Sequence, residues 1–388
     1  MSIRLLLFSL LAIFISSCSA QTEKSRIILG AEQFESYLPL LKDKKVGLLV
    51  NHTSLVNSTH LLDTLLALNI DVQKVFAPEH GFRGNADAGE LIKSDVDIKT
   101  GIPIVSMYGK SKKPSKETMA GLDAVVFDIQ DVGVRFYTYV SSMHYMMEAC
   151  AENNVQLIVL DRPNPNGDYF DGPVLQKKFQ SFVGMHPIPV VHGLTVGELA
   201  KMINDEYWLK DSLKTSLTVI PMQHYSHDTF YSLPVKPSPN LPNDISIRLY
   251  PSLCFFEATT ISVGRGTYMP FQVIGYPDSC MGDFTFTPVS IEGMSKYPSQ
   301  QNQLCYGIDL RQEPLSHMFT LKYFVDFMNK CVPSDTLIDR VRWFNLLAGN
   351  DMLLKKIKDG WSEEQIKESW HDELNNYAIL RQKYLLYP

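Results

Sequence analysis

Several motifs that identify common enzyme chemistries are missing from this sequence of 388 residues. No Gly-x-Gly-x-x-Gly follows a predicted strand, so a dinucleotide site is not indicated. No Gly-x-Ser-x-Gly elbow is present, which argues against a serine hydrolase. No His-Glu-x-x-His pair or comparable histidine cluster occurs, so a catalytic zinc ion is not indicated. The sequence therefore predicts neither a metal ion nor a nicotinamide cofactor.

Clustered positive charge and closely spaced cysteines are also missing. The 36 Lys and Arg residues are outnumbered by 42 Asp and Glu, which gives a net charge of −6, so nucleic acid is not an expected partner. The six cysteines contain no Cys-x-x-Cys pair, and their wide spacings predict neither a zinc site nor a dense disulfide framework. Cys150 recurs with Met143 and Met147 at helical spacing and is predicted to lie in the core.

The first 20 residues, MSIRLLLFSLLAIFISSCSA, have the pattern of a secretory signal. One arginine, Arg4, lies at the start of an apolar run from Ile3 to Ile15 that is shorter than the roughly 20 residues of a membrane span. The sequence ISSC resembles a lipobox, whose cysteine, here Cys18, is lipidated after cleavage. We therefore expect a periplasmic protein that a lipid on Cys18 anchors to the membrane. Cleavage after Ala20 would instead release a soluble periplasmic protein.

The remaining length predicts two domains. Between residues 25 and 233, near-continuous apolar stretches alternate with amphipathic ones, as a parallel sheet covered on both faces requires. This pattern predicts the α/β class with a doubly wound sheet. The expected strands are KVGLLVN, VQKVF, IPIVSMY, DAVVFDIQD, VQLIVLD and LTVIPM, and the expected helices are HLLDTLLALN, YVSSMHYMMEACAENN and TVGELAKMINDEYW.

A proline-rich stretch, PVKPSPNLPN at residues 234–243, predicts an extended crossing between the domains. Residues 244–388 mix short strand patterns (FQVIGYP, DFTFTPVSI, LCYGIDL) with helical ones (HMFTLKYFVDFMNKC and the C-terminal stretch), and thus predict a smaller α+β domain. Ser362 and Gln365 form a capping box that begins a helix after Gly360.

Polar residues collect in four loops that follow predicted strands. Ligands bind beyond the carboxyl ends of the strands in an open parallel sheet, so these loops form one candidate site. The candidates are His52 in VNHTS; Glu79, His80 and Arg83 in PEHGFRG; Asp128, Gln130, Asp131, Arg135, Tyr137 and Tyr139 in DIQDVGVRFYTY; and Asp161, Arg162 and Asn164 in DRPNPNG.

Each candidate also has a structural interpretation. A lone histidine such as His52 is more often a capping or core residue than a catalyst, and Asp161 with Arg162 could be an ion pair that closes a loop. Tyr137 and Tyr139 could pack in the core or stack on a sugar ring. Carboxylates are rarely buried without partners. The two carboxylates of FDIQD therefore either act together as a pair or have a counter-ion such as Arg135.

Seven motifs in order resemble the NamZ-like exo-β-N-acetylmuramidases. They are FAPEHGFRGNADAGE, FDIQDVGVRFYTYVSSMHYMMEACAENN, LDRPNPNG, GPVL, FVGMHPIPVVHGLTVGELA, PSPNLP and SVGRGTYMPFQVIG, and the similarity runs from about residue 27 to the C-terminus. The resemblance implies a Rossmann-like N-terminal domain, a smaller C-terminal domain and an active cleft between them. It adds His192, Asn240 and Arg265 to the candidates for substrate binding.

The resemblance also implies the reaction, which is removal of a terminal N-acetylmuramic acid from the non-reducing end of peptidoglycan fragments by hydrolysis of a β-1,4 bond. Disaccharides or muropeptides derived from peptidoglycan are then the expected partners. One departure is EATT (Glu257 to Thr260), where many members have Glu-Gly-Thr-Asn, and it puts the fine specificity in question.

The residues and the resemblance together predict roles. Glycoside hydrolysis needs a protonated carboxyl group near the leaving oxygen, and Glu79 on its glycine-framed turn is the first choice. Asp128 or Asp131 would be the second carboxylate, as a base, as a nucleophile or as a group that orients the acetamido group of the substrate. A bidentate arginine would bind the lactyl carboxylate of muramic acid. The candidates for that contact are Arg83, Arg135, Arg162 and Arg265.

Two other functions fit parts of the pattern. A lipoprotein that binds cell-wall sugars without cutting them would share the signal, the two domains and the polar cleft, although it has little need for so tightly framed a glutamate. A peptidoglycan amidase or esterase fits less well, because amidases usually carry a zinc constellation.

Overall fold

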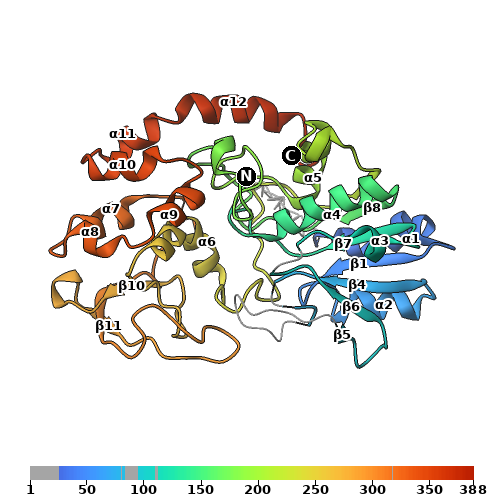
Figure 1. Ribbon diagram of the computed structural model, residues 1–388, viewed down its shortest axis with the longest axis horizontal. Coiled ribbons are helices and arrows are strands. Elements are labelled where there is room, and N and C mark those ends of the chain that lie inside the picture. Colours follow the sequence, from blue (N-terminus) through green and yellow to red (C-terminus); the bar gives the residue numbers. More distant parts are fainter. Residues whose placement is uncertain (1–25, 80, 84–94, 110–111, 317) are drawn as a thin grey trace, which may run out of the picture.

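The structure of this chain is a computed structural model that describes residues 26–79, 81–83, 95–109, 112–316 and 318–388. Figure 1 shows an N-terminal part, in blue and green, beside a C-terminal part, in yellow and red. None of the helices in these ranges is long and apolar enough to cross a membrane. The predicted signal with Cys18 lies outside the described residues, and so does His80.

A seven-stranded sheet forms the N-terminal part. Its order is β5-β6-β4-β1-β7-β8-β9, and every neighbouring pair is parallel except β5 with β6. The parallel strands, numbered along the chain, have the order 3-2-1-4-5-6 of Rossmann-type sheets, which confirms the predicted α/β class. The strands are β1 (Val46–Val50), β4 (Val72–Ala77), β5 (Asp95–Val96), β6 (Pro103–Ser106), β7 (Ala124–Asp128), β8 (Gln156–Leu160) and β9 (Leu217–Ile220), beside a separate hairpin of β2 (Leu55–Val56) and β3 (Thr59–His60).

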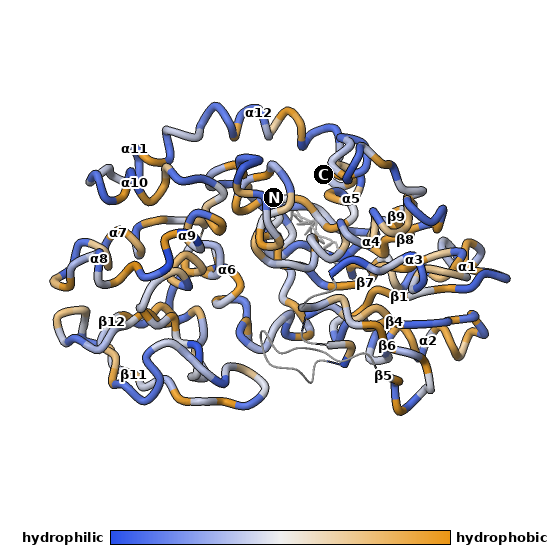
Figure 2. Tube along the Cα trace, viewed as in Figure 1, coloured by the Kyte–Doolittle hydropathy of each residue, from blue (hydrophilic) through white to orange (hydrophobic). Residues whose placement is uncertain are grey.

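Alternate residues of each strand enter two hydrophobic clusters, one on each face of the sheet. In β7, Val125 and Phe127 belong to one cluster with α4 and α5, whereas Ala124 and Val126 belong to the other with α1 and α2. This double burial explains why the central strands β1 and β7 are almost entirely apolar. Much of the tube through the sheet in Figure 2 is accordingly orange. The helices are α1 (Phe34–Leu41), α2 (Leu61–Ala67), α3 (Lys116–Met119), α4 (Tyr139–Asn153) and α5 (Val196–Asp205).

The C-terminal part combines a small antiparallel sheet with helices, which confirms the predicted α+β domain. Its strands β10 (Val273–Tyr276), β11 (Phe284–Phe286) and β12 (Cys305–Asp309) pair in the order β10-β12-β11. The predicted capping box is confirmed, since Ser362 and Gln365 exchange backbone and side-chain hydrogen bonds of 2.9 and 3.3 Å. The helices are α6 (Asp244–Leu253), α7 (Lys322–Met328), α8 (Ser334–Leu337), α9 (Val341–Ala348), α10 (Met352–Lys358), α11 (Glu363–Glu368) and α12 (His371–Gln382).

The end of the chain returns to the N-terminal part, because α12 runs across both parts (Figure 1). Tyr377 on α12 donates its hydroxyl to the carbonyl of His192 at 2.6 Å, and Tyr387 donates to Asp161 Oδ2 at 2.5 Å. The largest hydrophobic cluster also continues from α4 and α5 into α6 and α9. The two parts therefore share one core, which the local pattern around the prolines at 234–243 does not reveal.

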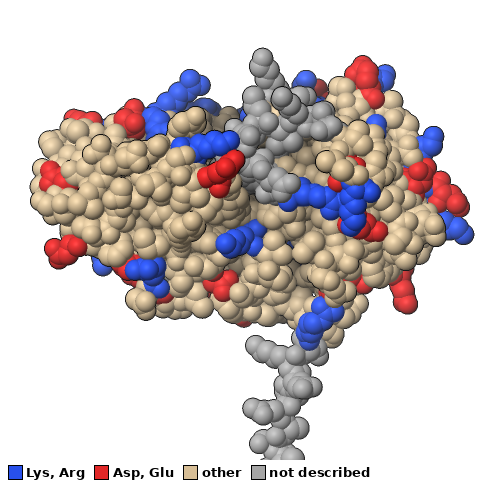
Figure 3. Space-filling model, turned by 90° about the horizontal axis from the view of Figure 1, so that it is seen from below, with Lys and Arg blue, Asp and Glu red and all other residues tan. Residues whose placement is uncertain are grey.

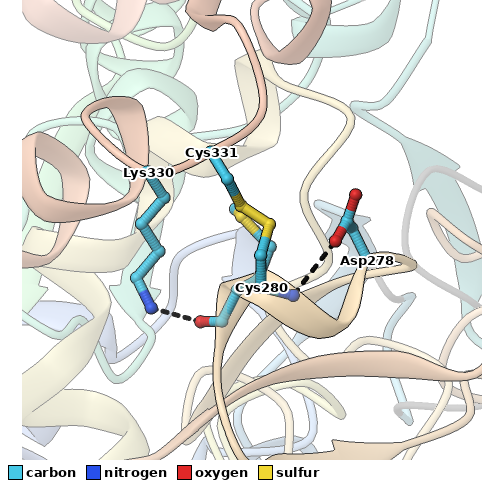
Figure 4. Close-up of a disulfide and its surroundings, with 5 residues drawn as sticks. Asp278, Cys280, Lys330 and Cys331 are labelled. Carbon is cyan, nitrogen blue, oxygen red and sulfur yellow. Dashed lines mark hydrogen bonds between the residues drawn. A yellow bond between two sulfur atoms is a disulfide. The ribbon is translucent and has the colours of Figure 1, made fainter.

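One disulfide, Cys280–Cys331, joins the turn before β11 to the end of α7 (Figure 4). Beside it, Asp278 accepts the amide of Cys280 at 3.0 Å and Lys330 donates its amine to a nearby backbone carbonyl. Cys150 is a buried thiol within the α4 core, as predicted. Disulfides persist mainly in oxidising compartments, so this bond is relevant to the compartment in which the protein functions.

Candidate active site

A cavity of about 630 Å³ lies between the two parts, beyond the carboxyl ends of β4, β6 and β7. Open parallel sheets bind ligands in this place, and the family resemblance leads to the same expectation. The wall residues that matter most below are Glu79, Tyr108, Lys112, Tyr137, Tyr139, Ser181, Phe182, Asn240, Tyr250, Glu257, Arg265, Phe271 and Trp343.

Glu79 enters the cavity from a turn directly after β4. The amide of Gly81 donates to the carbonyl of Pro78 at 3.2 Å, and Gly81 has a φ of 76°, which glycine adopts without strain. Tyr108, which follows β6, donates its hydroxyl to Glu79 Oε1 at 3.0 Å. Burial and then the nearby Glu79 raise the pKa of Tyr108 far above its ordinary value, so the phenol stays protonated and continues to donate.

Tyr137 and Tyr139 both line the cavity, with ring centroids 5.0 Å apart in an edge-to-face arrangement. Tyr137 donates its hydroxyl to the carbonyl of Pro237 at 2.6 Å. The hydroxyl of Tyr139 and the side-chain oxygen of Asn240 are buried without a hydrogen-bond partner among the described residues. An unpaired buried polar group costs about 1–3 kcal/mol, so a ligand that pairs with these atoms gains affinity.

Glu257 and Arg265 form an ion pair on the C-terminal side of the cavity. Nε and Nη2 of Arg265 both donate to Glu257 Oε1, at 3.0 and 2.5 Å, and the guanidinium lies 5.1 Å from the ring centroid of Phe271. Burial opposes the charge, but Glu257 outweighs it and raises the pKa of Arg265. A permanent cation is thus held at the cavity wall, with Nη1 outside the pair.

Arg135 does not bind a carboxylate within the described ranges, contrary to its predicted roles as counter-ion and substrate contact. Its Nη1 donates to the carbonyls of Pro173 and Ile188, both at 2.7 Å, and its Nη2 donates to the carbonyl of Leu347 at 2.9 Å. Burial lowers the pKa of Arg135 to about 9, so it is still charged at neutral pH. Since Leu347 belongs to α9, Arg135 joins the two parts of the chain.

Asp128 and Arg162 form a buried ion pair outside the cavity wall. Arg162 donates Nε to Oδ1 at 2.5 Å and Nη2 to Oδ2 at 2.9 Å, and Asp128 is 0% exposed. Because the two side chains pair with each other and neither lines the cavity, the structure lends no support to the predicted roles of Asp128 as the second catalytic carboxylate and of Arg162 as a substrate contact. Their pairing braces the ends of β7 and β8, and it also replaces the predicted pairing of Arg162 with Asp161.

Six other predicted substrate contacts satisfy polar groups of the protein itself. Asp161 accepts the hydroxyl of Thr195 at 2.7 Å and the amide of Gly197 at 2.8 Å, and so caps α5. Arg83 donates two hydrogen bonds of 2.9 Å to Asp97. Loops at strand ends expose backbone groups that need such partners, and this need alone can place polar residues at these positions. These six residues are His52, Arg83, Gln130, Asp161, Asn164 and His192, and none of them is a wall residue of the cavity.

The other members of that group show the same behaviour. The ring of His52 contacts the carbonyl of Lys236 at 2.8 Å, and Gln130 donates its amide to the carbonyl of Pro163 at 2.6 Å. Asn164 donates to the carbonyl of Leu194 at 2.9 Å. The ring Nδ1 of His192 accepts the amide of Leu194 at 3.2 Å, and burial lowers the pKa of His192 to about 3, so this ring is neutral.

Several wall residues escaped the sequence-based predictions. Tyr108 follows β6 directly, so the strand-end rule could have identified it. Glu257 is the one charged residue in the otherwise uncharged stretch CFFEATT, which is a usable signal. Tyr250 on α6 and Trp343 on α9 gave no signal, because their spacing is that of ordinary amphipathic helices.

Asp131, the other predicted carboxylate, is buried close to the cavity but is not part of its wall. Its Oδ1 accepts the amide of Gly133 at 2.7 Å, and its Oδ2 has no hydrogen-bond partner in the part of the chain that the structure describes. Burial raises the pKa of Asp131 to about 7. Its charge also contributes to the raised pKa values of Tyr137 and Tyr139. Asp131 therefore influences two wall residues electrostatically without lining the cavity itself.

A partly enclosed cavity with two carboxylates, aromatic rings and unpaired hydrogen-bonding groups, set between a Rossmann-type domain and a smaller domain, defines a carbohydrate-active protein of the glycoside hydrolase type. Comparison with protein families then gives two adjoining matches, to "Exo-beta-N-acetylmuramidase NamZ, N-terminal" over residues 46–245 and to "Exo-beta-N-acetylmuramidase NamZ, C-terminal" over residues 248–387. The chain belongs to the NamZ family of exo-β-N-acetylmuramidases, which confirms the resemblance of its motifs.

Three individual proteins are similar over most of their length. The peptidoglycan β-N-acetylmuramidase NamZ of Bacillus subtilis (strain 168) is 38% identical over 371 residues, which cover 90% of this chain and 89% of that protein. Two crystal structures of DUF1343 family proteins from Bacteroides fragilis NCTC 9343 have TM-scores of 0.87 and 0.82, with 46% and 28% identity. Each similarity covers 94% of this chain and 99% of the other.

The stability of the protein should depend on pH through Asp131. Its pKa is about 7 in the folded chain and near 3.8 in the unfolded one, so between these values the unfolded chain releases a proton that the folded chain keeps. The free energy of unfolding should therefore fall as the pH rises through this window and level off above it. Asp131→Asn removes this contribution.

Urea unfolding of both proteins at about pH 4 and about pH 8 measures the effect, since the difference in free energy of unfolding between wild type and variant should change across the window. A difference that is the same at both pH values would show that Asp131 ionises normally in the folded protein.

Proposed function

We propose that this protein is an exo-acting glycoside hydrolase that removes terminal, non-reducing, β-1,4-linked N-acetylmuramic acid from peptidoglycan fragments during cell-wall turnover. The observation that carries the proposal is that Glu79 and Arg265, from the two parts of the chain, line the same cavity. Similarity to the Bacillus subtilis peptidoglycan β-N-acetylmuramidase over most of both chains supports it. A sugar-binding protein without activity would have no need for a carboxyl group that Tyr108 holds in place.

The surface of the molecule supports a small saccharide rather than a polyanion as the partner. On the face drawn in Figure 3, basic and acidic side chains are scattered among neutral residues and form no continuous basic stripe. Nucleic acids require such a stripe. A fragment that carries one carboxylate, such as a terminal muramic acid, needs only one fixed cation, and Arg265 provides it at the cavity wall.

Glu79 is the proposed proton donor to the leaving oxygen. Its position on the wall of a partly enclosed cavity and the hydrogen bond from Tyr108 fix the direction of the carboxyl group. The second carboxylate of the site is Glu257, because Asp128 and Asp131 lie outside the wall. Glu79 and Glu257 come from different parts of the chain, so the catalytic arrangement depends on how the parts are joined.

Glu79→Gln should lower kcat by about 10²- to 10⁴-fold, because glutamine keeps the shape of the side chain but has no proton to transfer. The KM and the thermal midpoint should change little. Glu35→Gln, an exposed position on α1, makes the same chemical change far from the cavity and serves as the control. Release of N-acetylmuramic acid from a disaccharide with an unactivated leaving group is the measurement.

Two results would contradict this assignment. A Glu79→Gln protein that folds normally and cleaves the disaccharide near the wild-type rate would remove Glu79 from the role of acid. A loss of activity that only follows a loss of folded protein would show that Glu79 braces the turn.

Arg265 is the proposed contact for the lactyl carboxylate, which distinguishes muramic acid from glucosamine. Of the four candidate arginines, Arg83 is paired with Asp97, Arg135 with backbone carbonyls and Arg162 with Asp128. Arg265 alone among them is a wall residue. Glu257 and Phe271 hold its guanidinium in place, so little conformational freedom is lost when a carboxylate binds.

Arg265→Gln should lower kcat/KM for a β-N-acetylmuramide about 10- to 100-fold, as expected for the loss of a hydrogen bond between charged groups. Wild type should turn over the matching β-N-acetylglucosaminide slowly, and this rate should change much less in the variant, so the preference between the two substrates shrinks. Arg311→Gln, an exposed arginine paired with Asp309, is the matched control. An undiminished preference in the Arg265 variant would exclude this contact.

We also propose that the protein is exported and held at the membrane by a lipid on Cys18. The disulfide Cys280–Cys331 supports export, because such bonds persist in oxidising compartments. Cys18→Ala should convert a protein that needs detergent for extraction into a soluble periplasmic one. A wild-type protein that is already soluble and begins at Gln21 would show that cleavage follows Ala20 and that no lipid is attached.

A further inference from the structure

A second cavity, of about 890 Å³, adjoins the first one. It lies within the N-terminal part, between α4, the segment 175–187 and the loop 207–212. Ser181 and Phe182 line both cavities and form the wall between them. The two cavities are therefore neighbours across Ser181 and Phe182.

Backbone hydrogen bonds hold the shared wall in place and leave one polar group unused. Ser181 and Gly184 exchange backbone hydrogen bonds of 2.9 and 3.0 Å, and Ser141 on α4 donates its hydroxyl to the carbonyl of Phe182 at 2.7 Å. The hydroxyl of Ser181 is buried and has no hydrogen-bond partner among the residues that the structure describes. A polar ligand that crosses the wall would supply this partner.

Aromatic rings continue from the shared wall into the second cavity. The rings of Phe182 and Tyr145 are nearly parallel, with 13° between their planes and 6.2 Å between their centroids. Trp208 lines the second cavity, and one face of its ring is covered by His186 at 5.7 Å and 24°. Pyranose rings stack on such surfaces, because their C–H faces match the apolar face of an aromatic ring.

A buried polar network supports the Trp208 loop from behind. His186 is hydrogen-bonded to His144 at 3.0 Å, and His144 is hydrogen-bonded to Glu148 at 3.2 Å. Glu148 in turn accepts the amide of Lys210 at 3.0 Å. The loop that carries Trp208 is therefore fixed at two points, so the ring is held in position before any ligand binds.

The same loop has an unusual backbone. Tyr207, Asp211 and Ser212 have φ values of 56°, 55° and 55°, a region that residues other than glycine seldom adopt. All three line the second cavity. Backbone strain of this kind costs roughly 1–3 kcal/mol per residue and is retained mainly where it serves a function.

We propose that the second cavity binds the sugar that follows the scissile bond on the leaving side, with its ring stacked on Trp208. The proposal rests on the proposed function and names where the rest of the substrate binds. A neutral sugar fits better than an acidic peptide stem, because the charged wall residues balance each other. These residues are Glu148, Lys177, Lys210 and Asp211.

Trp208→Ala should lower kcat/KM about tenfold on a peptide-free tetrasaccharide whose non-reducing end is N-acetylmuramic acid, because the stacking contact is lost. On N-acetylmuramic acid linked to a small chromogenic phenol, which cannot reach the second cavity, kcat/KM should change less than about twofold. Tyr207→Ala, at a side chain that is 54% exposed, should give the same selective loss if the Trp208 variant does not fold. Trp361→Ala, at an exposed tryptophan outside both cavities, should change neither value.

Three results would overturn the proposal. An unchanged kcat/KM on the tetrasaccharide would show that the second cavity is not used, and an equal loss on both substrates would show a structural role for Trp208. A loss that occurs only when the substrate carries peptide stems would assign the cavity to the peptide. Failure of the proposed function is distinguished separately, because wild type would then release no phenol from the chromogenic substrate.

Discussion

One buried guanidinium, that of Arg135, sets the relation between the two parts of this protein. A charge without a counter-ion is expensive to bury, and only its hydrogen bonds offset that cost. Its partners are the carbonyls of Pro173, Ile188 and Leu347, and the last belongs to the C-terminal part. Separating the parts would remove the hydrogen bond from Nη2 to Leu347 and leave that nitrogen without its partner. Tyr137 and Tyr139 follow Arg135 within four residues. The position of Arg135 therefore helps to fix these two residues of the cavity wall.

The polar residues at the strand ends divide into two groups: those that hydrogen-bond within the protein and those whose polar atoms face the cavity. Asp128 with Arg162 and Asp161 with its helix cap are hydrogen-bonded within the protein and keep the loops in place. Tyr139 and Asn240 have polar atoms that find no partner among the described residues, and both face the cavity. This division explains how a site can be rigid and still have hydrogen bonds to offer to a ligand.

The sequence allowed most of the fold to be predicted but only part of the site. The parallel sheet, the helices on both faces and the capping box at Ser362 follow from periodicity and local hydrogen bonding, which are short-range properties. Glu79, Tyr137, Tyr139, Asn240 and Arg265 were predicted and do line the cavity. Contacts between distant segments decide whether a polar residue faces the cavity or braces a loop. These contacts cannot be predicted from a local sequence pattern. Tyr250 on α6 and Trp343 on α9, which line the second wall of the site, are the main examples.

A crystal structure of the protein with N-acetylmuramic acid bound tests the central claim most directly. The sugar should occupy the cavity between the two parts, with its lactyl carboxylate at hydrogen-bonding distance from Arg265 and its anomeric oxygen directed towards Glu79. A sugar bound at the rim near Asp128 and Arg162 would contradict this claim, and so would a sugar in the cavity whose lactyl group points away from Arg265.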